Sequence, residues 1–206
     1  MKKDLLVALI ILLTLSIQLK AEDSSETMKK LEAKKSLIHN AAVKFDVNES
    51  YLKAIIYVER TMNYDWKDDA LDEILAASGL NSSLGFCQVK LKTAYWIENQ
   101  LNNAESEFYP GDKYKGLLKI SGSPKEIIKK LYNDSLNICY AASYLRIFQS
   151  YWKKSGCPID NSPEILGTLY SSGPYYIGGR LRKPNKNPKP NLFGRNVMEA
   201  LKVYKD

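Results

Sequence analysis

The chain has 206 residues, a content of apolar residues of 45% and a formal net charge of +7. This apolar content excludes a disordered chain, and the length leaves room for one sizeable domain but not for two. The excess of positive charge is mild and predicts no nucleic-acid-binding protein.

The first 21 residues have the pattern of a secretory signal. Two lysines precede the almost uninterrupted apolar run Leu5–Leu19, and Ala21 supplies a small residue at its end. Leu19 fits poorly at the third position before a cleavage site, so an uncleaved membrane anchor stays open. We therefore predict export to the periplasm or cell envelope, with residues 22–206 forming a single domain.

Helical spacing of apolar residues dominates the next part of the chain. It predicts one amphipathic helix over residues 26–45, and Asn48 can cap a second helix over residues 49–61. One stripe of this second helix carries Leu52, Ile55, Ile56 and Glu59. An acid thus occupies a position where the pattern favours an apolar residue.

Residues 62–84 are rich in Asp, Asn, Ser and Gly and indicate a long surface excursion, with a short possible helix at residues 70–77. Residues 85–89 fit a short extended piece, although no convincing pair of strands is present. A short helix is expected over residues 93–101, before a polar loop that runs to Gly122.

The second half of the chain has clear helix starts. Ser123-Pro124-Lys125-Glu126 and Ser162-Pro163-Glu164 each combine a capping serine with proline at the first helical position. Between them, residues 135–153 predict a central buried helix. The helix that starts at Ser162 should break at Gly173-Pro174, and an extended loop over residues 178–191 should precede a last helix over residues 195–205. The fold class is therefore mainly α, with long loops.

Three cysteines, Cys87, Cys139 and Cys157, are too few for a disulfide scaffold or a zinc site. The predicted central helix separates Cys139 from Cys157, so any disulfide would include Cys87. The alternative, three free thiols, fits the sequence equally well. The single histidine, His39, lies in the first predicted helix without a nucleophile context. We expect neither a metal nor a cofactor. The catalytic chemistry that remains for this sequence is that of carboxyl groups.

Glu59 is the candidate for that chemistry. A carboxyl group on an apolar stripe loses hydration, which raises its pKa towards the value that suits a general acid. The alternative is that Glu59 ends its helix or pairs with a basic residue at the rim.

Four segments in order extend this picture, and they are Val47 to Glu59; Ser83-Leu84-Gly85-Phe86-Cys87-Gln88 with Thr93-Ala94; Asn137-Ile138 with Ala142, Tyr144 and Leu145; and Tyr170-Ser171-Ser172-Gly173-Pro174. They resemble, in turn, the catalytic-glutamate helix, the Gly-Leu-Met-Gln and Thr-Ala signature, the start of the long core helix, and the Ala-Tyr-Asn-Ala-Gly-Pro signature of the soluble lytic transglycosylase family. Members of that family are lysozyme-like enzymes that cleave peptidoglycan.

The resemblance implies a lysozyme-like fold of the goose type and a set of site residues. Glu59 would be the acid and base, Gln88 would line the glycan groove, and Tyr170 would pack beside the glutamate and hydrogen-bond in the site. Gly85 would let the backbone approach a sugar, and Ser83 and Ser171 belong to the same substrate-binding set.

Without the resemblance, Gln88 fits a rim amide and Tyr170 a half-buried core tyrosine. The sequence also departs from the family pattern. Arg60 replaces the serine that usually follows the glutamate, Ser171 replaces an asparagine, and the gap from Glu59 to Gly85 is longer than usual.

The implied activity is cleavage of the bond between N-acetylmuramic acid and N-acetylglucosamine, with formation of a 1,6-anhydro end, by a monomer acting on glycan strands. A lysozyme-type hydrolase would need a second acid, for which the candidates are Asp65, Asp68, Asp69 and Asp72. A non-catalytic glycan-binding or envelope-assembly protein could instead stack sugars on Tyr64, Trp66, Tyr175 and Tyr176.

A basic stretch near the C-terminus has no acid in it and contains Arg180, Arg182, Lys183, Lys186, Lys189 and Arg195. This stretch would suit an anionic envelope polymer as its partner. A weaker alternative is a membrane-tethered basic protein whose main role is to hold such polymers. The alternative is an ordinary solvated face.

Overall fold

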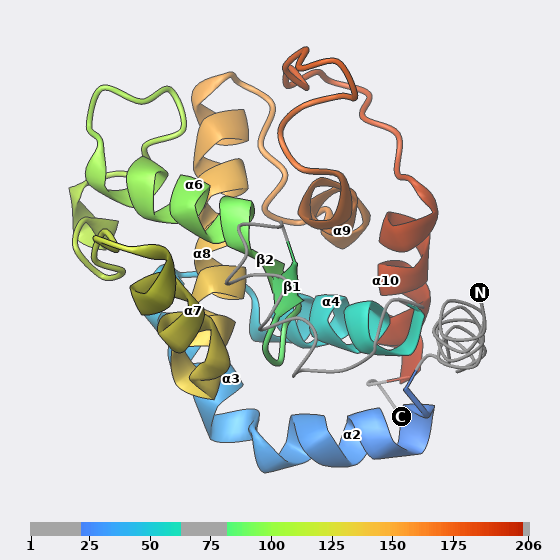
Figure 1. The fold of residues 1–206 in the computed structure, drawn as a ribbon. Coiled ribbons are helices and arrows are strands. Elements are labelled where there is room, and N and C mark those ends of the chain that lie inside the picture. The colour runs from blue at the N-terminus through green and yellow to red at the C-terminus, as the bar shows by residue number, and fades with distance from the viewer. Residues whose placement is uncertain (1–21, 63–81, 204–206) are drawn as a thin grey trace, which may run out of the picture.

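The computed structural model describes residues 22–62 and 82–203 and is mainly helical, which confirms the predicted class (Figure 1). Its α-helices are α2 (Ser24–Ala33), α3 (Lys35–Phe45), α4 (Glu49–Met62), α6 (Leu91–Asn102), α7 (Pro124–Tyr132), α8 (Asp134–Lys154), α9 (Pro163–Ser172) and α10 (Leu192–Val203). A short 3-10 helix, Asp112–Tyr114, and two strands, β1 (Ser83–Leu84) and β2 (Val89–Lys90), complete the described elements.

Capping explains where several helices begin. The side chain of Asn48 accepts a hydrogen bond from the amide of Tyr51, so its predicted capping role is confirmed. Ser123 caps α7 by accepting from the amide of Glu126, and Pro124 occupies the first turn. At α9 the proline is present but Ser162 makes no capping bond with its side chain.

The prediction of a single helix over residues 26–45 is wrong. The chain leaves helical geometry at Lys34, where φ is −107° and ψ is 11°, and this break separates α2 from α3. The break allows α2 to pack on α4 while α3 packs on α8. Because both pieces bury apolar residues at helical spacing, periodicity alone gave no sign of a one-residue interruption.

The prediction of an extended piece over residues 85–89 is also wrong. Residues 85–88 form the turn of a small antiparallel hairpin in which Ser83 lies opposite Lys90 and Leu84 opposite Val89. Gly85 and Gln88 adopt positive φ values of 71° and 50°, which reverse the chain direction within four residues.

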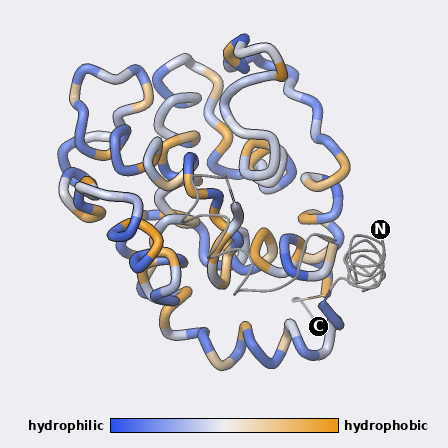
Figure 2. The backbone as a smooth tube through the Cα atoms, viewed as in Figure 1, coloured by the Kyte–Doolittle hydropathy of each residue, from blue (hydrophilic) through white to orange (hydrophobic). Residues whose placement is uncertain are grey.

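The helices bury a common core around α8, which contacts α3, α4, α6, α7 and α9. Its largest fully buried side chains include Phe45, Ile55, Ile97, Tyr140 and Phe148, from four different helices. Figure 2 shows hydrophobic positions recurring between hydrophilic ones along the helices, as burial of one helix face requires.

The last helix packs closely on α9 and starts at Leu192 rather than at the predicted Arg195, because Asn191 caps it through the amide of Gly194 at 2.8 Å. A Cβ atom at Gly194 would lie 2.0 Å from the carbonyl oxygen of Glu164. Glycine at this crossing therefore lets the two backbones touch.

Several sequence predictions fall on residues outside the described ranges: the signal at 1–21, the possible helix at 70–77, the end of the last helix, and the candidate residues Tyr64, Trp66, Asp65, Asp68, Asp69 and Asp72. Among the described helices, none is both long and apolar enough to cross a bilayer. Cys87, Cys139 and Cys157 are all free thiols, the first two buried and the third partly exposed.

Candidate active site

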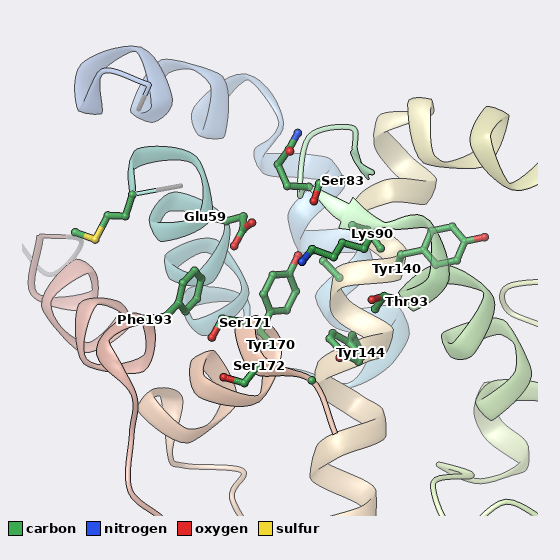
Figure 3. Close-up of a pocket in the computed structure, with 15 residues that line it drawn as sticks. Glu59, Ser83, Lys90, Thr93, Tyr140, Tyr144, Tyr170, Ser171, Ser172 and Phe193 are labelled. Atoms are coloured by element: carbon green, nitrogen blue, oxygen red, sulfur yellow. The ribbon is translucent and has the colours of Figure 1, made fainter. Parts of the chain in front are cut away.

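A cleft of about 410 Å³ opens between α4, the hairpin, α8, α9 and α10 (Figure 3). Its lining residues are Glu59, Met62, Ser83, Gln88, Val89, Lys90, Thr93, Tyr140, Ala141, Tyr144, Tyr170, Ser171, Ser172, Gly173 and Phe193. Parts of the sequence that lie far apart therefore meet here, and each of the four motif segments contributes at least one lining residue.

All the predicted site residues except Gly85 line this cleft. Glu59 comes from α4, Ser83 and Gln88 from the hairpin, and Tyr170 and Ser171 from the end of α9. The structure thus brings together side chains that lie up to 112 positions apart in the sequence.

Glu59 projects from the buried side of its helix. Leu52, Ile55 and Ile56 on the same stripe are fully buried, and Glu59 itself keeps only 8% of its surface exposed. Figure 3 shows its carboxylate and the hydroxyl end of Tyr170 pointing towards the same space. A carboxyl group in this position is largely removed from water yet open to a molecule in the cleft.

Tyr170 forms the opposite wall. Burial raises the pKa of its hydroxyl well above the usual range. Its ring packs edge-on against Tyr144 and stacks on Phe193. Tyr170 is therefore a fixed, neutral hydrogen-bond donor, and that hydroxyl donates to the carbonyl oxygen of Cys87 at 2.7 Å.

Asn137 of α8 holds the same turn from the other side. Its carboxamide oxygen accepts a hydrogen bond from the amide of Cys87 at 2.6 Å, and its nitrogen donates to the carbonyls of Leu84 and Leu131, each at 2.9 Å. Asn137 is fully buried, so these bonds are shielded from water. Sequence analysis placed Asn137 in a motif but assigned it no role; its signal was an amide near the start of a predicted buried helix.

Arg60 is the third residue that fixes the turn. Its guanidinium donates to the carbonyl of Phe86 at 3.0 Å and lies over the Phe86 ring, 4.6 Å from its centre. It also forms a two-bond ion pair with Glu22, at 2.6 and 2.8 Å. The residue after Glu59 therefore points out of the cleft and ties α4 to the hairpin, which accounts for arginine where the family pattern has serine.

Gly85 lies outside the cleft lining. A Cβ atom there would approach the carbonyl oxygen of Leu131 to 2.2 Å and the side chain of Asn137 to 2.5 Å. The glycine is thus required for close contact of the turn with α7 and α8, rather than for contact with a molecule in the cleft. Gln88, by contrast, lines the cleft and donates from its side chain to the carbonyl of Gly85 at 3.1 Å.

Asn191 supports the α9 side of the cleft. Its side-chain nitrogen donates to the hydroxyls of Ser171 and Ser172, each at 3.0 Å. Its oxygen accepts from Thr168 and from the amide of Gly194. An amide is therefore present beside Ser171, supplied from the cap of α10, and sequence analysis did not single it out.

A second buried acid, Glu98, shows that burial alone does not define the site. It is 1% exposed and accepts from the amide and hydroxyl of Ser121, from Lys130 and from the hydroxyl of Tyr140. These bonds join α6, α7 and α8, and Glu98 is absent from the cleft lining. Glu59 is distinguished by its access to a cavity.

The charge of the cleft comes from two of its lining residues, Glu59 and Lys90. Lys90, at the end of β2, is exposed and reaches towards the cleft in Figure 3. Within residues 22–62 and 82–203, no group of three His, Cys, Asp or Glu side chains is placed to hold a metal ion. The exposed His39 instead pairs with Glu49, 2.7 Å away.

No model of a known protein family matches this chain. A search of curated protein sequences also finds no match. The choice of a function therefore depends on the residues of the cleft and on the motifs that place them there.

Proposed function

We propose that this chain is a peptidoglycan lytic transglycosylase with a lysozyme-like helical fold and with Glu59 as its general acid and base. One observation carries the proposal: a carboxyl group that is 8% exposed lines a cleft together with Ser83, Gln88, Tyr170 and Ser171, the residues that the motif resemblance selects. Because peptidoglycan lies outside the cytoplasm, export through residues 1–21 is part of the proposal.

In the first step, neutral Glu59 transfers its proton to the oxygen that links N-acetylmuramic acid to the next sugar. The bond between that oxygen and the muramic acid C1 breaks, and the leaving sugar departs as an alcohol. The acetamido group of the muramic acid stabilises the positive charge that develops at C1.

In the second step, the Glu59 carboxylate takes the proton from the 6-hydroxyl of the same muramic acid, and the oxygen attacks C1. A 1,6-anhydro ring forms and Glu59 is again neutral, so no water is consumed. The attack is intramolecular and needs no second carboxylate to position a nucleophile. Glu59 is the acid that the described lining supplies, which suits this single-acid route.

The other lining residues supply orientation. Tyr144, Tyr170 and Phe193 give the cleft an apolar wall on which a sugar ring can pack. Gln88 and Ser171 offer amide and hydroxyl groups for sugar hydroxyls. The hydrogen bonds that Asn137, Arg60 and Tyr170 make to the turn hold in place the segment that carries Gln88.

The test is digestion of purified sacculi, with mass spectrometry of the soluble products. The proposal predicts fragments with 1,6-anhydro ends from the native protein. Reducing ends would show a lysozyme-type hydrolase; its candidate second acids, Asp65, Asp68, Asp69 and Asp72, lie outside the described residues. Binding to sacculi without any soluble product would show a non-catalytic glycan-binding protein.

A further inference from the structure

Residues 174–182, between α9 and α10, form a small hydrogen-bonded hairpin, which we call the finger. The amide of Tyr176 donates to the carbonyl of Arg180 at 2.8 Å, and the amide of Arg182 donates to that of Pro174 at 2.8 Å. Tyr175 and Leu181 pair as an isolated antiparallel bridge. In Figure 1 this segment lies at the end of the molecule opposite α2. The finger is thus a structured projection.

The tip of the finger is apolar. Ile177 is fully exposed, and Tyr175 and Tyr176 beside it keep 44% and 42% of their surface exposed. Gly178 and Gly179 follow with positive φ values, so the reversal after Ile177 carries no side chain. Figure 2 shows a short hydrophobic stretch at the outer end of this largely hydrophilic segment. An isoleucine that a structured turn holds in water is stabilised only when its side chain enters an apolar phase or contacts an apolar partner.

Five basic residues, which we call the collar, lie at the base of the finger and in the segment that follows it. The guanidinium groups of Arg180 and Arg182 lie over the Tyr176 ring, 4.7 and 3.9 Å from its centre. Lys183, Lys186 and Lys189 follow and are exposed. No acid occurs in the sequence between Glu164 and Glu199, so no carboxylate of this stretch offsets the five positive charges.

We propose that the finger inserts Ile177 into the interface of an anionic phospholipid bilayer, with the collar on the lipid phosphates. An aliphatic tip, tyrosines at the level of the headgroups and lysines and arginines behind them match the successive layers of such an interface. A soluble anionic polymer satisfies the collar equally well but offers no apolar phase for Ile177, which favours the bilayer.

The finger begins at Pro174, directly after Gly173, which lines the cleft. Insertion of its tip would therefore hold the cleft close to the membrane surface. The proposal does not depend on the catalytic assignment, since it rests on surface residues outside the cleft.

Depth-dependent quenching tests insertion directly and is independent of the state of residues 1–21. Ile177→Trp is mixed with phosphatidylglycerol vesicles whose acyl chains carry bromine, with Ile120→Trp as the matched control because Ile120 is 61% exposed between α6 and α7. We expect quenching above that of the native protein for Ile177→Trp and none for Ile120→Trp. No extra quenching at position 177, or equal quenching at both positions, overturns the proposal.

Binding strength gives a second, independent measurement on protein recovered from the envelope after export. Ile177→Ser should weaken binding to phosphatidylglycerol vesicles about tenfold or more, whereas Ile120→Ser should leave it unchanged. Added salt should weaken binding of the native protein, because it screens the collar. If Ile177→Ser binds phosphatidylglycerol vesicles and soluble polyphosphate as the native protein does, the segment is a site for polyanions and the bilayer proposal fails.

Discussion

The carboxamide of Asn137 and the backbone amide of Cys87, 50 positions apart, are joined by a hydrogen bond of 2.6 Å in the interior of the protein. With the bonds from Tyr170 to the carbonyl of Cys87 and from Arg60 to that of Phe86, side chains of α8, α9 and α4 all hold one four-residue turn. The turn positions Gln88, and Arg60 follows Glu59 directly in α4. The geometry of the cleft therefore depends on these three residues as much as on its lining.

Asn137→Ala should destabilise the protein by about 2–4 kcal/mol, because it leaves the buried amide of Cys87 and two carbonyls without their partner. Urea unfolding monitored by circular dichroism measures the change. The control is Asn133→Ala, which removes the cap of α8 and should cost only about 1 kcal/mol. Equal effects of the two substitutions would show that Asn137 has no special role.

Tyr170→Phe keeps the ring between Tyr144 and Phe193 but removes the bond to the Cys87 carbonyl. The loss of stability should be modest, about 1 kcal/mol. Activity on sacculi should fall by more than this loss explains, since the turn that holds Gln88 is released. Native activity in a variant of native stability would contradict the positioning role of Tyr170.

The Glu22–Arg60 pair makes stability dependent on pH. Burial of Glu22 opposes its ionisation, but hydrogen bonds from Arg60, Lys30 and Thr27 outweigh that effect and lower its pKa from 4.5 to about 2. A carboxyl group with a lowered pKa in the folded state stabilises that state above pH 4.5, and the contribution is lost as the pH falls towards 2. Glu22→Gln should therefore be less stable than the native protein near neutral pH.

The measurement is the midpoint of urea unfolding at a series of pH values for both proteins. The difference between them should shrink steadily below pH 4.5 and vanish near pH 2. A difference that is constant across this range would mean that the charge of Glu22 does not contribute.

Gly194→Ala tests the contact of α10 with α9. The added methyl group would lie 2.0 Å from the carbonyl of Glu164 and 2.4 Å from the hydroxyl of Thr168, so the helices must separate. The expected loss is about 1–3 kcal/mol, with displacement of Phe193 from the cleft. Gly122→Ala is the control, because its nearest neighbour would be 3.8 Å away and its effect should stay within about 0.5 kcal/mol. The measurement is the melting temperature of each variant by calorimetry. Equal melting temperatures for the two variants would refute the close packing.

Local sequence patterns were sufficient for part of this structure. The caps at Asn48 and Ser123 and the stripe that carries Glu59 depend on residues within one or two turns of each other, so spacing reveals them. The break at Lys34 was missed because apolar spacing continues across it, and what separates α2 from α3 is packing against two different helices.

The supports of the site were beyond such patterns. Asn137 and Arg60 act on backbone groups 26 to 53 positions away, and no local rule connects an amide in one helix to a distant turn. The motif resemblance selected the lining residues Gln88 and Tyr170 but also Gly85, whose glycine is explained by contact with Asn137. Asn191 escaped notice because it lies in a loop whose path depends on the packing of α10.

The most direct test of the central claim is the rate at which Glu59→Gln releases soluble fragments from labelled sacculi. Its control is Glu49→Gln, on the exposed side of the same helix and outside the cleft. We predict that Glu59→Gln loses at least about 100-fold in rate while its melting temperature stays close to that of the native protein, and that Glu49→Gln keeps native activity. A Glu59→Gln protein that releases fragments as fast as the Glu49→Gln control would contradict the assignment of Glu59 as the acid and base.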